Sequence, residues 1–253
     1  MIQVLRAACA AVLFLAAGNA AAVAQSVSPQ QKTEIEAIIR DYLVTNPEVI
    51  EEAIAALQKK KAEQQDAETA AKISESKDTL FNSSRQVVLG NPEGDVTLVE
   101  FFDYNCGYCK RAYGDMAELL KEDPKLRIVL KEFPVLGQGS IEAAQVAIAV
   151  KLTDEAKYGD FHQKLLGIQG RANGAAALKV AQDLGLDMDA VKKNMDSSEV
   201  GATVEEVYTM ANTLGLTGTP SYVIGSEVLV GAVGYDTLKD KIKSMRTCGE
   251  TSC

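Results

Sequence analysis

The sequence predicts an α/β fold that carries a helical insertion and follows a helical N-terminal region. Three observations lead to this prediction. Two apolar, β-rich runs, 96–104 and 126–134, flank an amphipathic helical pattern. Residues 140–215 have helical patterns throughout, with short breaks at glycines. Residues 26–81 are rich in Ala, Gln, Glu and Lys and begin with an apolar stripe at helical spacing.

Residues 1–24 have the form of a secretory leader. Arg6 precedes an apolar run, and residues 22–24 read Ala-Val-Ala, a small-x-small cleavage site. A membrane anchor is the alternative, but the run is shorter than the ~20 residues that a helical span needs. Cys9 lies before the run rather than after it, which argues against lipid attachment. We therefore expect an exported protein whose mature chain starts at residue 25.

The chain is acidic. Its 253 residues contain 26 Lys and Arg against 35 Asp and Glu, which gives a formal net charge of −9. This balance argues against nucleic acid and against an anionic membrane surface as partners. We expect partners among proteins or small molecules. The length suits one domain with an extension, or two small domains.

Residues 25–58 are predicted to form a helical oligomerisation region, and residues 59–81 a charged helical linker. Ser28, followed by Pro29 and by Gln31 three residues later, is a helix start signal. The apolar stripe then comprises Ile35, Ile38, Ile39, Tyr42, Leu43, Val49, Ile50, Ala53, Ile54 and Leu57. Such a stripe needs a partner surface, which is either another copy or the chain's own domain. The charged run 58–78 favours another copy, because it would hold the stripe away from the body.

Residues 82–247 are predicted to form the catalytic domain. Each apolar run there has a length and composition typical of a strand or a helix. The two long strands flank one helix, which predicts a parallel pair with a right-handed crossover. In order, we expect a strand at 86–89, a buried central strand at 96–104, a helix to about 120, a buried strand at 126–134, helices over 140–215, two short strands joined at 225–226, and a helix from 236.

Four cysteines follow the leader, in two close pairs. Of the three possible pairings, this grouping favours Cys106–Cys109 and Cys248–Cys253. Export would place them where disulfides persist. A zinc site would need four ligands, which both pairs together, with His162 in reserve, would supply. A C-x-x-C directly after a central strand favours a redox pair instead, with a structural staple as the other alternative. His162 is interpreted as a packed helix residue, and no metal is expected.

The position of the first pair indicates its chemistry. Cys106 should lie at a helix N-terminus, where unpaired N–H groups and the helix dipole favour an anion. A stabilised thiolate is a good attacking and leaving group. Cys109, one turn further on, should face inward and resolve the mixed disulfide that Cys106 forms.

Three motifs carry a resemblance to a known family: EFFDYNCGYC (100–109), KEFPVLG (131–137) and TGTPSYVIG (217–225). Over residues 85–245 the chain resembles the thioredoxin-fold, DsbA-like thiol-disulfide oxidoreductases of bacterial periplasms. The resemblance implies a thioredoxin fold with a helical insert at about 140–215, a periplasmic location, protein substrates that carry disulfides or thiols, and no cofactor beyond the protein's own disulfide.

The resemblance also assigns roles. The family's cis-proline, which faces the redox pair and lets the preceding residue pair with a substrate strand, maps onto Thr219 and Pro220. Glu100 occupies the buried-acid position. A carboxyl group in an apolar strand has a raised pKa, so Glu100 would relay protons for Cys109. A salt bridge from Glu100 to Lys131 on the neighbouring strand would be compatible with that role.

The dipeptide Gly107-Tyr108 bears on the direction of exchange. The family's strong oxidants have a His between the cysteines, and a tyrosine adds no positive charge, so we expect a milder oxidant. Gly-Tyr, with Thr before the cis-proline, matches the periplasmic disulfide isomerases, which implies an isomerase. The alternatives are a DsbA-type dithiol oxidase and, from another class, a module that binds copper through cysteines.

The N-terminal region has a resemblance of its own. DYLVTNPEVIEEAIAALQ (41–58) resembles the trimerising stalk of the suppressor-of-copper-sensitivity, or ScsC-like, branch. This implies a homotrimer, with a dimer or a monomer as alternatives. A membrane partner would keep the pair reduced in an isomerase or oxidised in an oxidase. In the tail, 248–253, we expect Cys248 and Cys253 to form a structural disulfide, with a redox relay or a copper-binding pair as alternatives.

Overall fold

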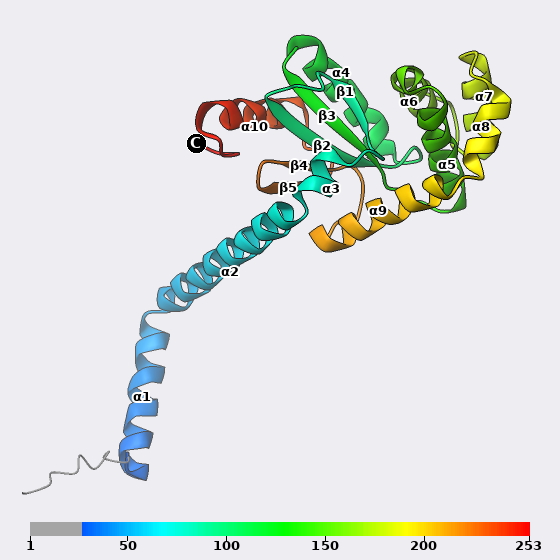
Figure 1. The fold of residues 1–253 in the computed structure, drawn as a ribbon. Helices are drawn as coiled ribbons and strands as arrows, with labels where there is room; N and C mark the ends of the chain where they lie inside the picture. Colours follow the sequence, from blue (N-terminus) through cyan, green and yellow to red (C-terminus); the bar gives the residue numbers. More distant parts are fainter. Residues whose placement is uncertain (1–26) are drawn as a thin grey trace, which may run out of the picture. The chain divides into compact units, whose positions relative to one another are not determined.

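The computed structural model describes residues 27–253, so the leader expected at 1–24 lies outside the described residues. The chain divides into two compact units, residues 1–58 and 59–253, which are described separately. Helix α1 (Pro29–Thr45) and the start of helix α2 (Glu48–Glu75) belong to the first unit (Figure 1). The rest of α2 and all later elements belong to the second.

Helix α1 begins where the sequence predicts. The Gln31 backbone N–H donates to Ser28 Oγ at 3.2 Å, and the Ser28 backbone N–H donates to Gln31 Oε1 at 3.0 Å. These two bonds form a complete capping box, with Pro29 at the first helical position. No residue of α1 is buried, and its apolar stripe is open to solvent within this unit, with Ile38 68 % exposed.

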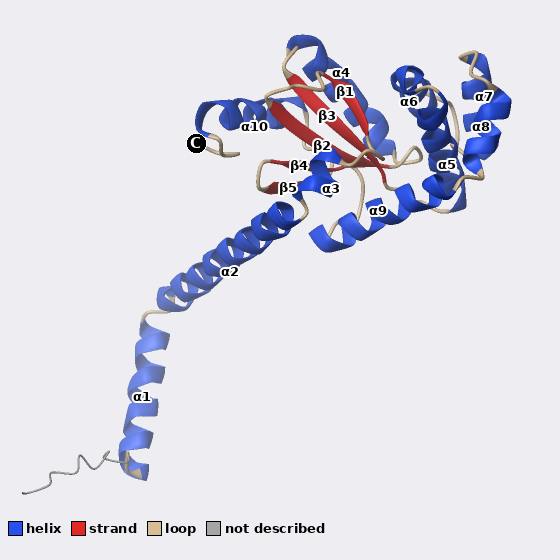
Figure 2. Ribbon diagram, in the orientation of Figure 1, coloured by secondary structure: helices blue, strands red, loops and turns tan. Residues whose placement is uncertain are grey.

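The second unit is built on one sheet of five strands in the order β1-β3-β2-β4-β5 (Figure 2). The central pair β2–β3 is parallel, as the sequence predicts, and the other three pairs are antiparallel. The strands are β1 (Val87–Gly90), β2 (Val96–Phe102), β3 (Leu126–Glu132), β4 (Ser221–Ile224) and β5 (Glu227–Val230).

Helices connect and cover this sheet. Helix α4 is the crossover between β2 and β3, and the block from α5 to α9 is inserted between β3 and β4. The helices of the unit after α2 are α3 (Lys77–Asn82), α4 (Gly107–Glu122), α5 (Gln138–Thr153), the 3₁₀ turn η1 (Glu155–Lys157), α6 (Tyr158–Leu166), α7 (Gly174–Asp183), α8 (Met188–Met195), α9 (Ser198–Leu214) and α10 (Tyr235–Cys248).

Both faces of the sheet are buried. Because side chains alternate along a strand, Leu98 and Phe102 of β2 lie on one face and Val99 and Phe101 on the other. The first face packs in one apolar cluster with residues of α4, α5, α6 and α10. The second packs in another cluster with residues of α9 and α3. The apolar runs of the two long strands reflect this burial on both sides.

The end of the expected linker lies in the core. The sequence analysis assigns residues 59–81 to a charged linker, yet Ile73 is 3 % exposed, Leu80 is fully buried, and both pack in the second cluster. Lys131 Nζ also donates to the Thr79 carbonyl at 2.7 Å. The boundary expected at residue 82 therefore falls before Ile73, because these two apolar side chains complete one face of the sheet.

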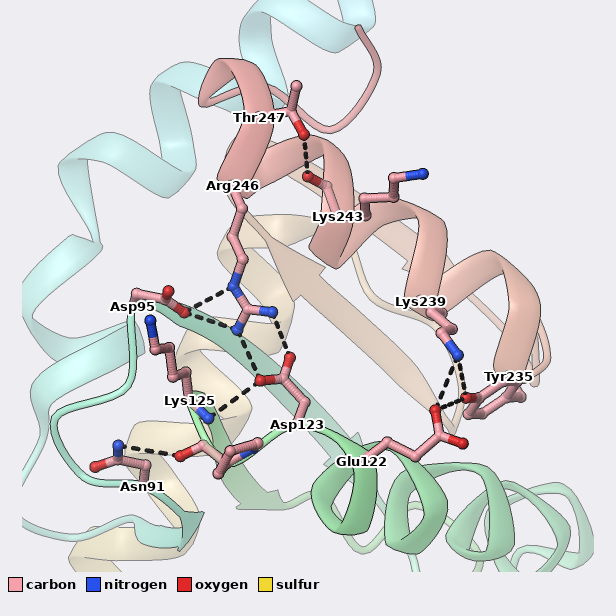
Figure 3. A network of polar contacts seen from close by, with 11 residues as sticks. Asn91, Asp95, Glu122, Asp123, Lys125, Tyr235, Lys239, Lys243, Arg246 and Thr247 are labelled. Carbon is pink, nitrogen blue, oxygen red and sulfur yellow. Dashed lines mark hydrogen bonds and ion pairs between the residues drawn. The ribbon is translucent and has the colours of Figure 1, made fainter.

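Helix α10 is held to the far end of α4 by ion pairs (Figure 3). The Arg246 guanidinium donates to the Asp95 carboxylate at 2.9 and 2.7 Å and to the Asp123 carboxylate at 2.6 and 3.0 Å. Lys239 Nζ donates to the Glu122 carboxylate at 2.8 Å. These groups are partly exposed, so each single pair contributes modestly. Together they fix α10 against the turn that enters β2.

The chain ends in a disulfide between Cys248 and Cys253, and both residues are exposed. The neighbouring Thr251 and Met245 lie against Gly225, at the turn between β4 and β5. Since β4 is antiparallel to β2, this turn marks the end of the sheet where β2 begins. Cys106 follows the opposite end of β2, so the tail disulfide and the C-x-x-C pair are at opposite ends of the sheet.

Candidate active site

Cys106 and Cys109 lie at the N-terminus of α4, as the sequence predicts. Cys106 is the N-cap residue, and the Cys109 backbone N–H donates to Cys106 Sγ at 3.4 Å. Both are free thiols. Cys106 is 5 % exposed and Cys109 is 1 % exposed, so Cys106 is the more accessible of the two cysteines. The Cys106 sulfur thus accepts a hydrogen bond from one of the N–H groups that have no partner within the first turn of α4.

The Thr219–Pro220 segment lies directly against this pair. The Thr219–Pro220 peptide bond is cis. The Cys106 thiol donates to the Thr219 carbonyl oxygen at 3.1 Å. The two residues are 113 positions apart in the chain. They meet because β4, which starts at Ser221, runs antiparallel to β2 and so begins beside the end of β2 that leads to Cys106.

Glu100 is buried in the middle of β2, between Leu130 and Tyr222 on the neighbouring strands. It is 2 % exposed, and its Oε2 atom has no hydrogen-bond partner. Burial raises the pKa of Glu100 to about 8. Burial also raises the pKa of the Cys109 thiol, and the charge of Glu100 adds to that effect. The Glu100 carboxyl group and the Cys109 thiol are therefore electrostatically coupled.

The salt bridge considered between Glu100 and Lys131 is wrong. Lys131 pairs across the ladder with Phe101, so its side chain projects from the opposite face of the sheet. There Lys131 Nζ lies 3.7 Å from the Glu206 carboxylate and donates to the Thr79 carbonyl. Glu100 is left without a cationic partner, which is why its carboxyl group favours the protonated form.

Gly107 and Tyr108, which separate the cysteines, form the first turn of α4. A side chain at Gly107 would meet nothing within 4 Å, so the position is open on its outer side. Tyr108 is 60 % exposed, and the Arg111 guanidinium carbon lies 4.4 Å from the centre of its ring. The dipeptide thus presents an aromatic surface beside Cys106.

A polar cluster that sequence reasoning missed holds the loop before Cys106. The buried Asp103 carboxylate accepts hydrogen bonds from the Asn105 backbone N–H at 2.7 Å, from Ser140 Oγ at 2.8 Å and from the Leu136 backbone N–H at 2.9 Å. Asn105 Nδ2 donates to the Ala172 carbonyl at 2.9 Å, and the Ala172 N–H donates to Asn105 Oδ1 at 2.7 Å. This cluster fixes the loop against α5 and the segment before α7.

A second buried cluster lies under the same loop. The hydroxyls of Tyr104 and Tyr158 both donate to Glu132 Oε1, the first at 3.3 Å. Tyr104 Oη also lies 3.3 Å from His162 Nδ1. Burial raises the pKa of Glu132 to about 8 and lowers that of His162 to about 3, so both favour their neutral forms. The only signal for Glu132 was its place in the KEFPVLG motif.

No group of three or more His, Cys, Asp or Glu side chains in residues 27–253 is arranged to hold a metal ion. No helix within that range is both long enough and apolar enough to cross a bilayer.

Two family models match the chain. The DSBA-like thioredoxin domain matches residues 97–243, which is more than half of the chain. The N-terminal domain of the copper resistance protein ScsC matches residues 31–64. The two matches fall on the catalytic region and on the helical N-terminal region.

Solved structures and curated relatives agree with these matches. A thioredoxin-like oxidoreductase from Silicibacter pomeroyi DSS-3 is 42 % identical, with a TM-score of 0.65, and the match covers 68 % of this chain and 98 % of that one. Proteus mirabilis ScsC in a transitional conformation is 31 % identical, with a TM-score of 0.63, over 86 % of this chain and 97 % of that one. Disulfide bond formation protein D of Bacillus subtilis is 27 % identical over 62 % of this chain and 76 % of its own length.

Other curated relatives are much longer. The chain spans about a quarter of the length of the Na⁺/H⁺ antiporters NhaA of Salinispora that it matches, at 26–27 % identity. The 165 matched residues therefore resemble one part of a longer protein. With its helix-capping cysteine pair, its cis-proline against Cys106 and the family match over more than half its length, the chain belongs to the DsbA-like thioredoxin domain family.

Proposed function

We propose that this protein is a thiol-disulfide oxidoreductase of the periplasm that isomerises disulfides in client proteins. One observation carries the proposal: Cys106 caps α4 and contacts the Thr219 carbonyl at 3.1 Å, while Cys109 is sealed beneath it. In this proposal, Cys106 is the reactive sulfur and the adjacent Thr219 backbone pairs with a client strand. Thr219 is half-buried rather than sealed, which supports its role in docking.

The reaction follows from the positions of the groups. The Cys106 thiolate attacks one sulfur of a client cystine, the client S–S bond breaks, and the second client sulfur leaves as a thiolate. In isomerisation, another client thiolate attacks the mixed disulfide and regenerates Cys106. If the client does not resolve it, Cys109 attacks Cys106 Sγ and releases the client reduced. Glu100 accepts the proton that the buried Cys109 must lose.

The assembly is part of the proposal. Residues 31–64 match the ScsC N-terminal domain, and the stripe on α1 is exposed within its own unit, with Ile38 at 68 % and Tyr42 at 55 %. We propose a homotrimer in which this stripe is buried between copies. Several Cys106 sites on one particle raise the effective concentration of thiolate around a bound client. A membrane reductase would keep these sites reduced.

The test uses the full chain and a pair of matched variants. Ile38→Lys with Tyr42→Lys places charges on the stripe, whereas Thr33→Lys with Ala37→Lys adds the same charge on the opposite face of α1. We expect the stripe variant to become monomeric by light scattering and to lose most of its activity in refolding scrambled ribonuclease. The control variant should keep both. Full isomerase activity in a monomeric stripe variant would contradict the oligomeric mechanism.

The same variants address the alternative direction. A DsbA-type dithiol oxidase is favoured if the monomer oxidises reduced ribonuclease faster than the wild type does. In that case the assembly would serve to suppress oxidation, and a membrane oxidase would be the expected partner.

A further inference from the structure

Three cationic side chains surround the exposed surface beside Cys106. Lys110 and Arg111 follow Cys106 by four and five residues on α4, and Arg171 comes from the loop that precedes α7. Lys110 is half-buried, and the two arginines are exposed. We call these three residues the cationic rim. They stand out because the chain as a whole has a formal net charge of −9.

Neutral groups hold the cationic rim in place. Lys110 Nζ donates to the carbonyl oxygens of Ile168 and Gly170 at 3.3 and 3.5 Å. Arg171 donates to the Leu136 carbonyl at 3.1 Å, and Arg111 lies over the ring of Tyr108. These contacts orient the cations without neutralising them.

No carboxylate of the described residues forms a direct ion pair with the rim. Within residues 27–253, none of its three side chains takes part in an ion pair of 4 Å or less. The nearest acid in sequence, Asp115, is half-buried four residues after Arg111 on α4, and it forms no ion pair with Arg111 within 4 Å. Asp103, before the cysteine pair, is buried and accepts three hydrogen bonds, so its carboxylate does not face the surface. The positive charge is therefore directed to solvent, where a bound partner would meet it.

The rim is close to the reacting sulfur. Arg171 is next to Ala172, whose backbone pairs with the side chain of Asn105, the residue before Cys106. Leu136, whose carbonyl Arg171 binds, is 43 % exposed, and the neighbouring Val135 is 38 % exposed. Exposed apolar side chains thus adjoin the cations: Tyr108 lies under Arg111, and Val135 and Leu136 lie in the segment whose carbonyl Arg171 binds.

We propose that the cationic rim recognises acidic segments of client proteins, so that Cys106 exchanges fastest with cystines flanked by Asp or Glu. The inference rests on the proposed function and adds a preference among its clients. Opposite charges raise the rate of encounter, and like charges lower it. The chain as a whole has a net charge of −9, so its overall field does not attract an acidic segment, and the attraction comes from the rim.

The test uses three synthetic peptides, each with one internal disulfide and the same core. Two Glu, two Gln or two Lys flank the disulfide on each side. The measured quantity is the second-order rate constant for reduction of each peptide by the pre-reduced full chain. At low ionic strength we expect the acidic peptide to react at least about fivefold faster than the neutral one, and the basic peptide to be slowest. In about 0.5 M salt the three rates should converge.

Matched variants assign the effect to the rim. Lys110→Gln, Arg111→Gln and Arg171→Gln together remove three positive charges, and Lys192→Gln, Lys193→Gln and Lys243→Gln remove three from exposed positions elsewhere. The first variant should lose the preference and keep the rate with the neutral peptide. The second should keep the preference. The salt dependence of the wild type needs no variant, so it tests the proposal even if a variant folds poorly.

The outcomes separate this inference from the proposed function. Equal rates with all three peptides, or a preference that survives in the rim variant, would overturn the role of the rim and leave disulfide exchange intact. Failure to reduce even the neutral peptide would overturn the proposed function itself.

Discussion

At the scale of single residues, Glu100 is a carboxyl group almost fully removed from water. It is 2 % exposed, it has no cationic partner, and its Oε2 atom accepts no hydrogen bond. An ionised carboxylate at such a site is costly, which raises its pKa to about 8. Ionising Glu100 therefore costs stability in the folded protein, which fits the proton transfer to and from Cys109 that we propose for it.

Glu100→Gln should flatten the dependence of stability on pH. The folded-state pKa lies above the unfolded value, so the folded protein binds more protons and stability falls as pH rises from about 4.5 to about 8. One such group contributes up to about 1.4 kcal/mol per pH unit. We expect the variant to lose less stability than the wild type between pH 5 and pH 8, measured by urea unfolding.

Glu132 and His162 are present in both proteins and contribute equally to the pH dependence of their stability. Like Glu100, Glu132 makes stability fall as pH rises, because its pKa is raised. His162, with a pKa lowered to about 3, makes stability rise with pH below about pH 6.5. The comparison therefore depends on the difference between the two curves. Parallel curves for wild type and variant would show that Glu100 ionises normally.

At the scale of elements, the loop before α7 and the loop before α4 behave as one unit. Asn105 joins them through two hydrogen bonds to the Ala172 backbone and one from its Nδ2 to Ser140 Oγ at 2.9 Å. The helical insertion thereby positions Cys106 from outside the sheet. This gives the inserted helices a role at the site besides covering one end of the domain.

Asn105→Ala should loosen this junction and slow exchange at Cys106. It leaves the buried Ala172 backbone groups without partners, which costs about 1–3 kcal/mol. We expect faster hydrogen exchange at the Ala172 amide and a slower reaction of Cys106 with a neutral disulfide. Asn173→Ala is the matched control, because it removes only the cap that Asn173 Oδ1 gives the Ala176 N–H at 2.9 Å. Equal effects of both changes on Cys106 would contradict a specific role for Asn105.

The elements differ in how far the sequence could predict them. β2, the cysteines and α4 follow from one continuous stretch, so local pattern was enough. The partner of Asn105 is 67 residues away, and nothing near either residue indicates the contact. Lys131 and Glu100 looked like a pair because they lie on adjacent strands, but the register places Lys131 opposite Phe101. Contacts of this kind depend on register and topology, which a local pattern leaves open.

At the scale of the whole molecule, the two cysteine pairs lie at opposite ends of the sheet. The tail disulfide closes a small exposed loop after α10, and Arg246 fixes that helix on the far side from Cys106. Direct exchange between the pairs within one catalytic body is therefore excluded by distance along β2. The tail disulfide is better explained as a closure of the chain end.

Cys248→Ser with Cys253→Ser should leave the chemistry at Cys106 unchanged. The loop spans only five positions, so the chain-entropy model gives the disulfide at most about 2 kcal/mol. We expect the same rate of exchange with a neutral peptide disulfide and a small fall in the free energy of unfolding. Cys106→Ser, by contrast, would abolish exchange, because it removes the attacking sulfur. A large loss of rate in the tail variant would assign the tail pair to an electron relay between molecules.

The burial of Ile73 and Leu80 has a practical consequence for protein engineering. A catalytic fragment that begins at residue 83 would lack these two side chains and expose apolar residues on one face of the sheet. Such an exposed apolar surface promotes aggregation. A fragment that begins at Lys59 keeps both side chains and retains the polar C-terminal part of α2. Another assembly module, a surface tether or a reporter can replace the N-terminal helices. It should be joined before Lys59, so that this part of α2 is kept.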